Sequence, residues 1–280
     1  MTDNTMSIDF SLLKTVPAVL RARGFRLYTQ DGRRLIDLWL NGGAAILGHT
    51  PPNLLRELKN TASRGLYAPL PHFTESRFLK ALSKLFPGRS FRLYAAPPPE
   101  LTELFNSGAV KLWRPFIDPA SPFAVENAPL LIPVLPGIQS WRGELPLGLC
   151  IAAAESENQL AQLPTNDILP PLLLSAAARG LYDILASPQR AKPALSRLAK
   201  VMQTDDFKKR WRRQGIYLSL KEKTGNDEWA ALFAQFLDAG FLLPPNQNQP
   251  LILPGELSDG EEAKLAAVLS GSGKTPAYNL

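Results

Sequence analysis

Apolar and polar positions along residues 25–40 follow the pattern of a β-hairpin. Phe25, Leu27 and Tyr28 lead into the pair Asp31-Gly32, and a second segment, 35–40, is apolar except for Asp37. An Asp-Gly pair between two such runs is typical of a tight turn, because glycine readily adopts the positive φ that the turn requires. The pattern therefore predicts two antiparallel strands near the start of the chain.

Other segments carry apolar residues at the three- and four-residue spacing of an amphipathic helix. Asn53 follows two prolines and is the candidate N-cap of the first helix, since its side chain can accept from a free backbone N–H. The first predicted helix begins at Asn53. The other predicted helices cover 75–86, 169–186, 227–239 and 259–269, and two more lie in the basic segment 190–213.

Short apolar runs in the middle and at the end of the chain predict buried strands. Proline-rich loops separate the central ones. The predicted order along the chain is a hairpin, helices, a centre of mixed strands and helices, and an α+β end. This order indicates an α/β fold, and the sequence has no internal repeats. The predicted strands cover 91–94, 129–134, 147–153, 216–220, 241–243 and 251–253.

The composition excludes several classes of protein. The chain has 280 residues, 45% of them apolar, and no apolar run approaches the ~18 residues of a membrane span. Asp3 and Asp9 stand where a signal peptide carries cations, so we expect a soluble cytoplasmic protein. A single cysteine, Cys150, and two histidines, His49 and His72, exclude an intrachain disulfide and leave no metal-ligand spacing.

The formal charge of +6 is concentrated in residues 190–213. Such a run could bind an anionic surface, with Trp211 available for stacking on a base. The favoured alternative is a solvated helical face whose Trp211 packs inward, because no nucleic-acid-binding motif accompanies the run. The candidate anion-binding residues are Lys208, Lys209, Arg210, Arg212 and Arg213.

The stretch from Gly24 to Leu58 resembles the start of the class III aminotransferases, which use pyridoxal phosphate. That family opens with a hairpin, a glycine loop, Leu-Gly-His, a proline and a helix. Weaker similarity continues through the Phe-Pro-Gly at 86–88, the apolar helix at 168–186 and the segment 214–270. The matching letters at the start are Leu27-Tyr28-Thr29-Gln30-Asp31-Gly32-Arg33-Arg34-Leu35-Ile36-Asp37, Asn41-Gly42-Gly43, Leu47-Gly48-His49 and Pro52, with Thr29 and Leu35 replacing the usual Asp and Tyr.

This resemblance implies a shortened pyridoxal-phosphate-transferase-like fold that forms a homodimer. Both chain ends, residues 1–65 and 204–280, would build a small α+β domain. Residues 66–203 would form a central α/β domain with a mostly parallel sheet, and the family places its cofactor there, at the subunit interface.

Three parts of the family's chemistry are missing from this sequence. The cofactor needs a lysine amine, but no lysine occurs between Lys111 and Lys192. The phosphate is held by backbone N–H groups at a helix N-terminus, where this chain has three successive prolines at 97–99, which lack that group. The ring nitrogen needs an acid at a strand end, where this chain has no aspartate between Asp118 and Asp167 and the candidate is Glu155, after the predicted strand 147–153. Asn106-Ser107-Gly108 resembles the family's phosphate-binding motif in its residues, but it lies too far along the chain to align with that motif.

The sequence therefore favours a pseudoenzyme with no catalytic residues and no bound cofactor, kept as a structural or regulatory homodimer or as the partner of another protein. We expect no membrane or nucleic-acid partner. One alternative is an active enzyme with a rearranged site, which binds pyridoxal phosphate or another ligand near Asn41, Gly42, Gly43 and Tyr67. The other alternative is nucleic-acid or acidic-surface binding through 190–213. Tyr67 and His72 otherwise fit ordinary structural roles.

Overall fold

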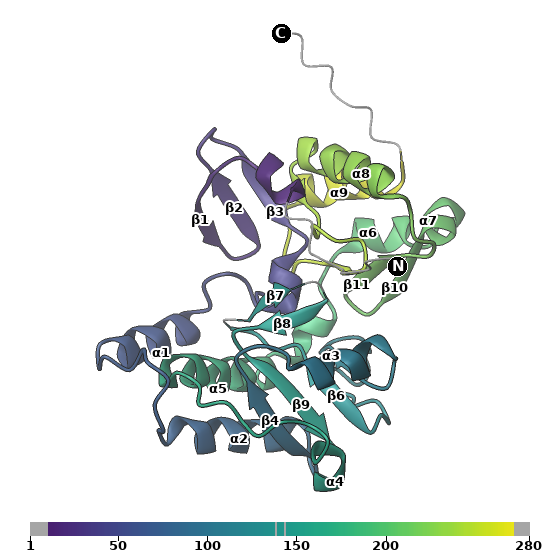
Figure 1. Ribbon diagram of the computed structural model, residues 1–280. Helices are drawn as coiled ribbons and strands as arrows, with labels where there is room; N and C mark the ends of the chain where they lie inside the picture. The colour runs from purple at the N-terminus through teal and green to yellow at the C-terminus, as the bar shows by residue number, and fades with distance from the viewer. Residues whose placement is uncertain (1–10, 138, 143, 272–280) are drawn as a thin grey trace.

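Helices and strands gather in two lobes that meet at a short hairpin. The computed structural model describes residues 11–137, 139–142 and 144–271. The lower lobe in Figure 1 runs from α1 to α5, and the upper lobe combines the first three strands with the elements from α6 onward. Strands β7 (Ser140–Arg142) and β8 (Leu145–Leu147) lie between the lobes. The predicted α/β class is confirmed.

The sheet of the lower lobe has the strand order β4-β9-β6-β5. Strands β4, β6 and β5 share one direction, while β9 lies between β4 and β6 and runs against both. Strand β9 is antiparallel because only the short β7–β8 hairpin separates it from β6. The sheet is therefore mixed. Its strands are β4 (Ser90–Tyr94), β5 (Lys111–Trp113), β6 (Leu130–Pro133) and β9 (Cys150–Ala154).

Helices cover both faces of this sheet, and the alternation of side chains along β9 shows how. Ile151 and Ala153 pack toward α2 and α5, whereas Cys150 and Ala152 belong to the core under α3 and α4. Helix α1 also packs on α5. The helices are α1 (Pro52–Ala62), α2 (Thr74–Leu85), α3 (Pro99–Asn106), α4 (Glu157–Leu160) and α5 (Pro171–Leu185).

Both ends of the chain build the upper lobe. One sheet has the order β1-β2-β3-β12, in which β12 (Phe241–Leu242) lies parallel to β3. The predicted hairpin forms β2 (Arg26–Thr29) and β3 (Arg34–Asp37), and β1 (Val19–Arg23), which the pattern did not predict, pairs with β2. A second sheet has the order β10-β11-β13, with β10 (Trp211–Gln214), β11 (Tyr217–Leu220) and β13 (Leu251–Ile252). The α-helices of this lobe are α6 (Ser196–Val201), α7 (Asp205–Arg210), α8 (Asn226–Asp238) and α9 (Asp259–Leu269), and the 3-10 helices are η1 (Leu12–Thr15), η2 (Leu40–Gly43) and η3 (Pro188–Ala191).

One hydrophobic core joins these chain ends, and it also takes in residues 184–202. Phe25 and Leu35 from the first strands share this core with Phe233 and Leu265 from α8 and α9. Burial of these side chains provides the main stabilisation of the lobe. The domain boundaries at 65/66 and 203/204 stay predictions.

Two details of the sequence-based expectation are wrong. Asn53 is not the N-cap of α1, because the helix begins at Pro52 and the Asn53 amide instead donates to the Asp183 carboxylate at 3.1 Å. The basic run does not form one helical face, because α7 ends at Arg210 and β10 begins at Trp211. Trp211 does pack inward, as favoured, and is only 2% exposed.

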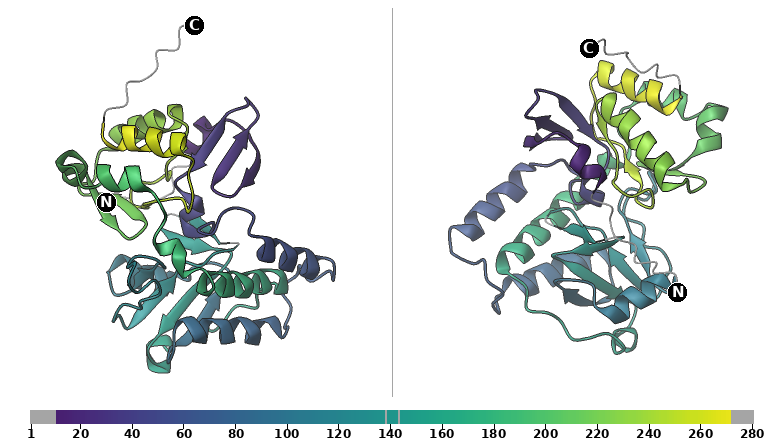
Figure 2. Two further views of the ribbon diagram at one scale, coloured as in Figure 1. Left: turned by 180° about the vertical axis from the view of Figure 1, so that it is seen from behind. Right: turned by 45° about the horizontal axis from the view of Figure 1, so that its top comes forward.

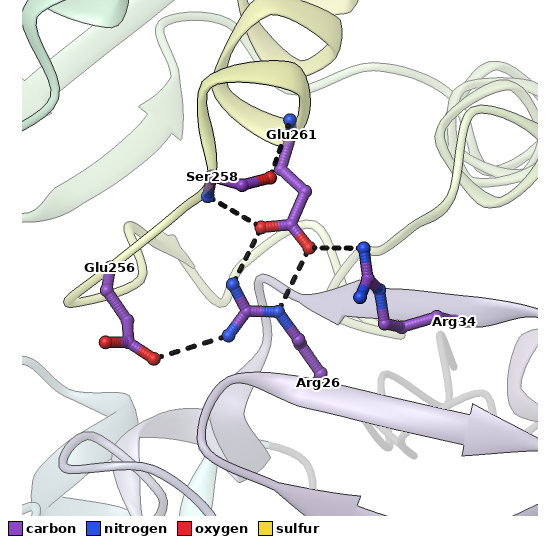
Figure 3. A network of polar contacts seen from close by, with 5 residues as sticks. All are labelled: Arg26, Arg34, Glu256, Ser258 and Glu261. Atoms are coloured by element: carbon purple, nitrogen blue, oxygen red, sulfur yellow. Dashed lines mark hydrogen bonds and ion pairs between the residues drawn. The ribbon is translucent and has the colours of Figure 1, made fainter.

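An ion-pair network ties the N-terminal hairpin to α9 (Figure 3). The Arg26 guanidinium donates twice to the Glu261 carboxylate, at 3.0 and 2.7 Å, and Arg34 lies 3.2 Å from the same group. Ser258 caps α9: its backbone N–H donates to the Glu261 carboxylate, and its hydroxyl oxygen accepts from the Glu261 backbone N–H. The hydrogen bonds from Arg26 lower the pKa of Glu261 to about 2. Figure 2 shows the purple hairpin beside the yellow α9 that this network joins.

We predict that Glu261→Gln lowers the free energy of unfolding by roughly 2 kcal/mol at pH 7, since it removes one partner of a partly buried pair. The Glu261 pKa lies below its ordinary value, so the stabilisation is complete above about pH 4.5 and is lost as the pH falls toward 2. Urea unfolding at several pH values measures this. Glu256→Gln is the control: Glu256 contacts the same Arg26, but its side chain is 73% exposed, so the loss should stay below about 0.5 kcal/mol. Equal losses in the two variants would contradict the prediction.

Candidate functional site

The predicted glycine loop follows β3 and has an unusual backbone. Four successive residues adopt a positive φ: Leu40 at 48°, Asn41 at 48°, Gly42 at 64° and Gly43 at 112°. A non-glycine residue in this region costs free energy, so the surroundings must hold Leu40 and Asn41 in place.

Asp37 holds the first part of this loop. One of its carboxylate oxygens accepts from the backbone N–H groups of Trp39 and Leu40, both at 2.8 Å. The other carboxylate oxygen lies 2.9 Å from Nε2 of His49. Asp37 is buried. The Asp and His of the resemblance therefore fix the backbone turn here.

Residues from the connection between the lobes hold the second part of the loop. The Asn41 side-chain amide donates to the backbone oxygen of Gln139 at 2.7 Å. The Trp141 indole N–H donates to the backbone oxygen of Asn41, also at 2.7 Å. The Arg114 guanidinium donates to the Gly42 oxygen at 2.8 Å. These contacts satisfy polar groups of the loop within the chain itself.

Trp141 fills the space directly over Gly42. A Cβ atom on Gly42 would lie 2.3 Å from the indole ring, so only glycine fits at this position. The Trp141 side chain is 4% exposed, and the Arg114 guanidinium lies 5.6 Å from its ring centroid. Burial lowers the pKa of Arg114. The region over the glycine loop is a packed aromatic contact.

Tyr67 lies outside this packed cluster. It is 60% exposed, in the connection between α1 and α2, which Figure 1 shows at the outer edge of the lower lobe. The structure thus brings together Asn41, Gly42 and Gly43 from the candidate pocket and leaves Tyr67 at the surface. The sequence analysis missed Trp141, Gln139 and Arg114. No local sequence pattern links these residues to the loop, because each contacts it from a distant part of the chain.

The predicted phosphate position lies at the start of α3. The helix begins at Pro99 with Pro98 before it, and its first N–H bonded within the helix belongs to Thr102. Pro97, Pro98 and Pro99 supply no N–H group to an anion. Ser107 lies at the opposite, C-terminal end of α3. The prolines therefore remove three of the N–H donors that could contact a phosphate at this helix start.

Charged groups that a cofactor would use are at the surface. Every lysine among the described residues is exposed. Glu155, the candidate ring acid, is exposed and lies 3.4 Å from the Arg89 guanidinium. In the described ranges no group of three His, Cys, Asp or Glu side chains could hold a metal ion. A hollow beside Trp113 and Arg114 measures about 70 Å³, which is too small for a cofactor.

The candidate anion-binding residues are all exposed. Lys208, Lys209 and Arg210 lie on α7, and Arg212 and Arg213 follow on β10. Because Trp211 is buried between them, it offers no ring on which a base could stack.

We predict that Gly42→Ala lowers the free energy of unfolding by roughly 3–4 kcal/mol, because the new methyl group clashes with the Trp141 ring and strains a positive φ. Gly32→Ala is the matched control. Its φ is 81°, and nothing lies within 4 Å of a Cβ there, so only the strain of about 1 kcal/mol applies. Denaturant unfolding of both variants measures the difference. A loss at Gly42 no larger than at Gly32 would contradict the packing described here.

The chain is similar to several known proteins. An uncharacterized protein of Treponema pallidum (strain Nichols) is 29% identical over 87% of this chain and 91% of its own length. The glutamate-1-semialdehyde 2,1-aminomutase of Sorangium cellulosum (strain So ce56) is 36% identical over 69 residues, which are 25% of this chain and 16% of the aminomutase. No protein-family profile matches the chain.

Solved structures show where the fold belongs. Ornithine delta-aminotransferase of Plasmodium falciparum superposes with a TM-score of 0.64 at 11% identity over 92% of each chain. A transaminase with pyridoxal phosphate bound gives a TM-score of 0.63 at 12% identity over 92% of this chain and 90% of that one. None of the helices in the described ranges has the length and hydropathy needed to span a membrane. The chain has the fold of the class III aminotransferases in a shortened form.

Proposed function

We propose that the chain is an aminotransferase-like protein without transaminase activity, which acts in the cytoplasm as a structural or regulatory homodimer. The contact between Trp141 and the glycine loop carries this proposal. An aromatic side chain covers Gly42, and the polar groups of Asn41 and the Gly42 oxygen bond within the chain. A small-molecule site needs open space and unsatisfied polar groups, and this loop offers neither.

Pyridoxal phosphate does not fit the residues that are present. The cofactor needs a lysine amine in the central domain, but no lysine lies between Lys111 and Lys192. Its phosphate needs backbone donors, but Pro98 and Pro99 begin helix α3. Its ring nitrogen needs a fixed acid, but the exposed Glu155 pairs with Arg89. These three mismatches support an inactive protein over an enzyme with a rearranged site.

We predict that purified protein incubated with pyridoxal phosphate shows no stable absorbance of a Schiff base. Borohydride reduction and peptide mapping should then find only low-level labelling, spread over several surface lysines. A class III aminotransferase treated in parallel supplies the positive control. Stoichiometric reduction onto one defined lysine would overturn the proposal and favour the rearranged enzyme.

Exposed apolar side chains support the homodimer. The connection between α1 and α2 holds an uncharged run from Leu66 to Phe73, in which Tyr67 is 60%, Leu70 52% and Phe73 64% exposed. The Leu172 N–H donates to the Leu66 oxygen at 3.2 Å, which places this run beside the start of α5, where Ile168 is 56% exposed. Apolar patches of this kind are characteristic of protein interfaces. A second copy of the chain would bury this patch.

We predict a dimeric mass for the wild-type protein at micromolar concentration in light scattering coupled to gel filtration. The double variant Tyr67→Ser/Phe73→Ser should be monomeric, because it removes two large apolar side chains from the patch. Leu20→Ser is the control, since Leu20 is 71% exposed on β1, away from the patch. A monomeric wild-type protein, or a double variant that stays dimeric, would contradict this face as the interface.

A further inference from the structure

The outer edge of β10 combines an open strand with a dense group of cations. Strand β10 is the last strand in the order β10-β11-β13, and within the described residues it pairs only with β11. A sheet edge of this kind can accept another strand through backbone hydrogen bonds.

The register shows which backbone groups face this edge. The Lys221 N–H donates to the Arg210 oxygen at 3.0 Å, and Arg212 pairs with Ser219 in the same antiparallel register. Hydrogen-bonded positions alternate in such a ladder, so 210, 212 and 214 bond toward β11. The N–H and C=O groups of Arg213 therefore point away from β11, toward the open edge.

The segment around this edge holds seven cations and five acids. Among the residues that the structure describes, the five candidate anion-binding cations form one ion pair, the contact of Lys209 with Asp206 at 3.8 Å, and both of those side chains are about 80% exposed. Such an exposed pair contributes little. The cations of the edge are Lys208, Lys209, Arg210, Arg212 and Arg213, joined by Lys221 and Lys223 in the next loop, and the acids nearby in the chain are Asp205, Asp206, Glu222, Asp227 and Glu228.

A surface hollow of about 320 Å³ adjoins the start of β10 and reaches the side of α8. Arg210 and Glu228 line it together with the apolar side chains of Ala231 and Leu232. A hollow with both apolar and charged lining suits the side chains of a peptide. A nucleic acid would lack the stacking partner it needs, because Trp211 is buried.

We propose that the β10 edge binds an extended acidic segment of a partner protein, which pairs with the outward backbone groups of Arg213 and places its carboxylates among the cations. This inference does not depend on the proposed loss of catalysis. Cations on an edge strand also protect it against aggregation, and that simpler role predicts no peptide binding.

Fluorescence anisotropy of the full-length protein tests the proposal, with a labelled ten-residue peptide of alternating Glu and Val as the probe. We expect saturable binding at 50 mM salt that weakens at 150 mM salt. The same peptide with N-methyl groups on alternate residues keeps its charge but loses backbone donors, and it should bind at least tenfold more weakly. A ten-nucleotide single strand of thymidine should also bind more weakly than the peptide.

Two substitutions at one position separate charge from backbone. Arg213→Ala removes a cation and keeps the outward N–H, so we expect a loss of about threefold. Arg213→Pro also removes that N–H, while the bonds to β11 stay intact, and should weaken binding at least tenfold. Thermal unfolding checks that both variants fold. If Arg213→Pro does not fold, the N-methylated peptide with wild-type protein still tests whether backbone hydrogen bonds contribute to binding. Absence of binding, equal binding of the two peptides, or tighter binding of the oligonucleotide would overturn the proposal.

Discussion

The close contact of the glycine loop with Trp141 determines how the two lobes meet. Leu40 and Asn41 hold a positive φ only because Asp37 bonds the backbone before them and the Gln139–Trp141 segment bonds Asn41. Gly42 brings the backbone against the indole ring, where any side chain would collide. The strained backbone is thus maintained by hydrogen bonds from the end of β3 in the upper lobe and from the connection between the lobes.

The upper lobe depends on a second long-range interaction, between segments more than two hundred residues apart. Arg26 in the hairpin bonds Glu261 in the first turn of α9, and β12 adds to the sheet beside β3. Glu261 also completes the cap of its own helix with Ser258, so one carboxylate fixes the start of α9 and its position on the hairpin. The hydrophobic core below the network then excludes water.

The residues of the aminotransferase resemblance have structural roles in this fold. The residues that resemble an aminotransferase, such as Asp37, Gly42 and His49, make contacts that hold the backbone, and those contacts need no cofactor. Packing and turn geometry of this kind support the fold independently of any chemistry carried out on it. The surfaces left open are the uncharged run at 66–73 and the β10 edge, and both are suited to binding other chains.

The sequence by itself determined the features that depend on neighbouring residues. The Asp31-Gly32 turn predicted the hairpin, and helical spacing with acids in the first turn predicted α9 over 259–269, as the structure has it. Tertiary structure decided the rest. Asn53 donates to a distant carboxylate instead of capping its helix, and Trp141 fills the space over Gly42. Local patterns fix tight turns and the apolar spacing of helices, whereas contacts across a hundred residues depend on how complete elements pack, which no short window of sequence contains.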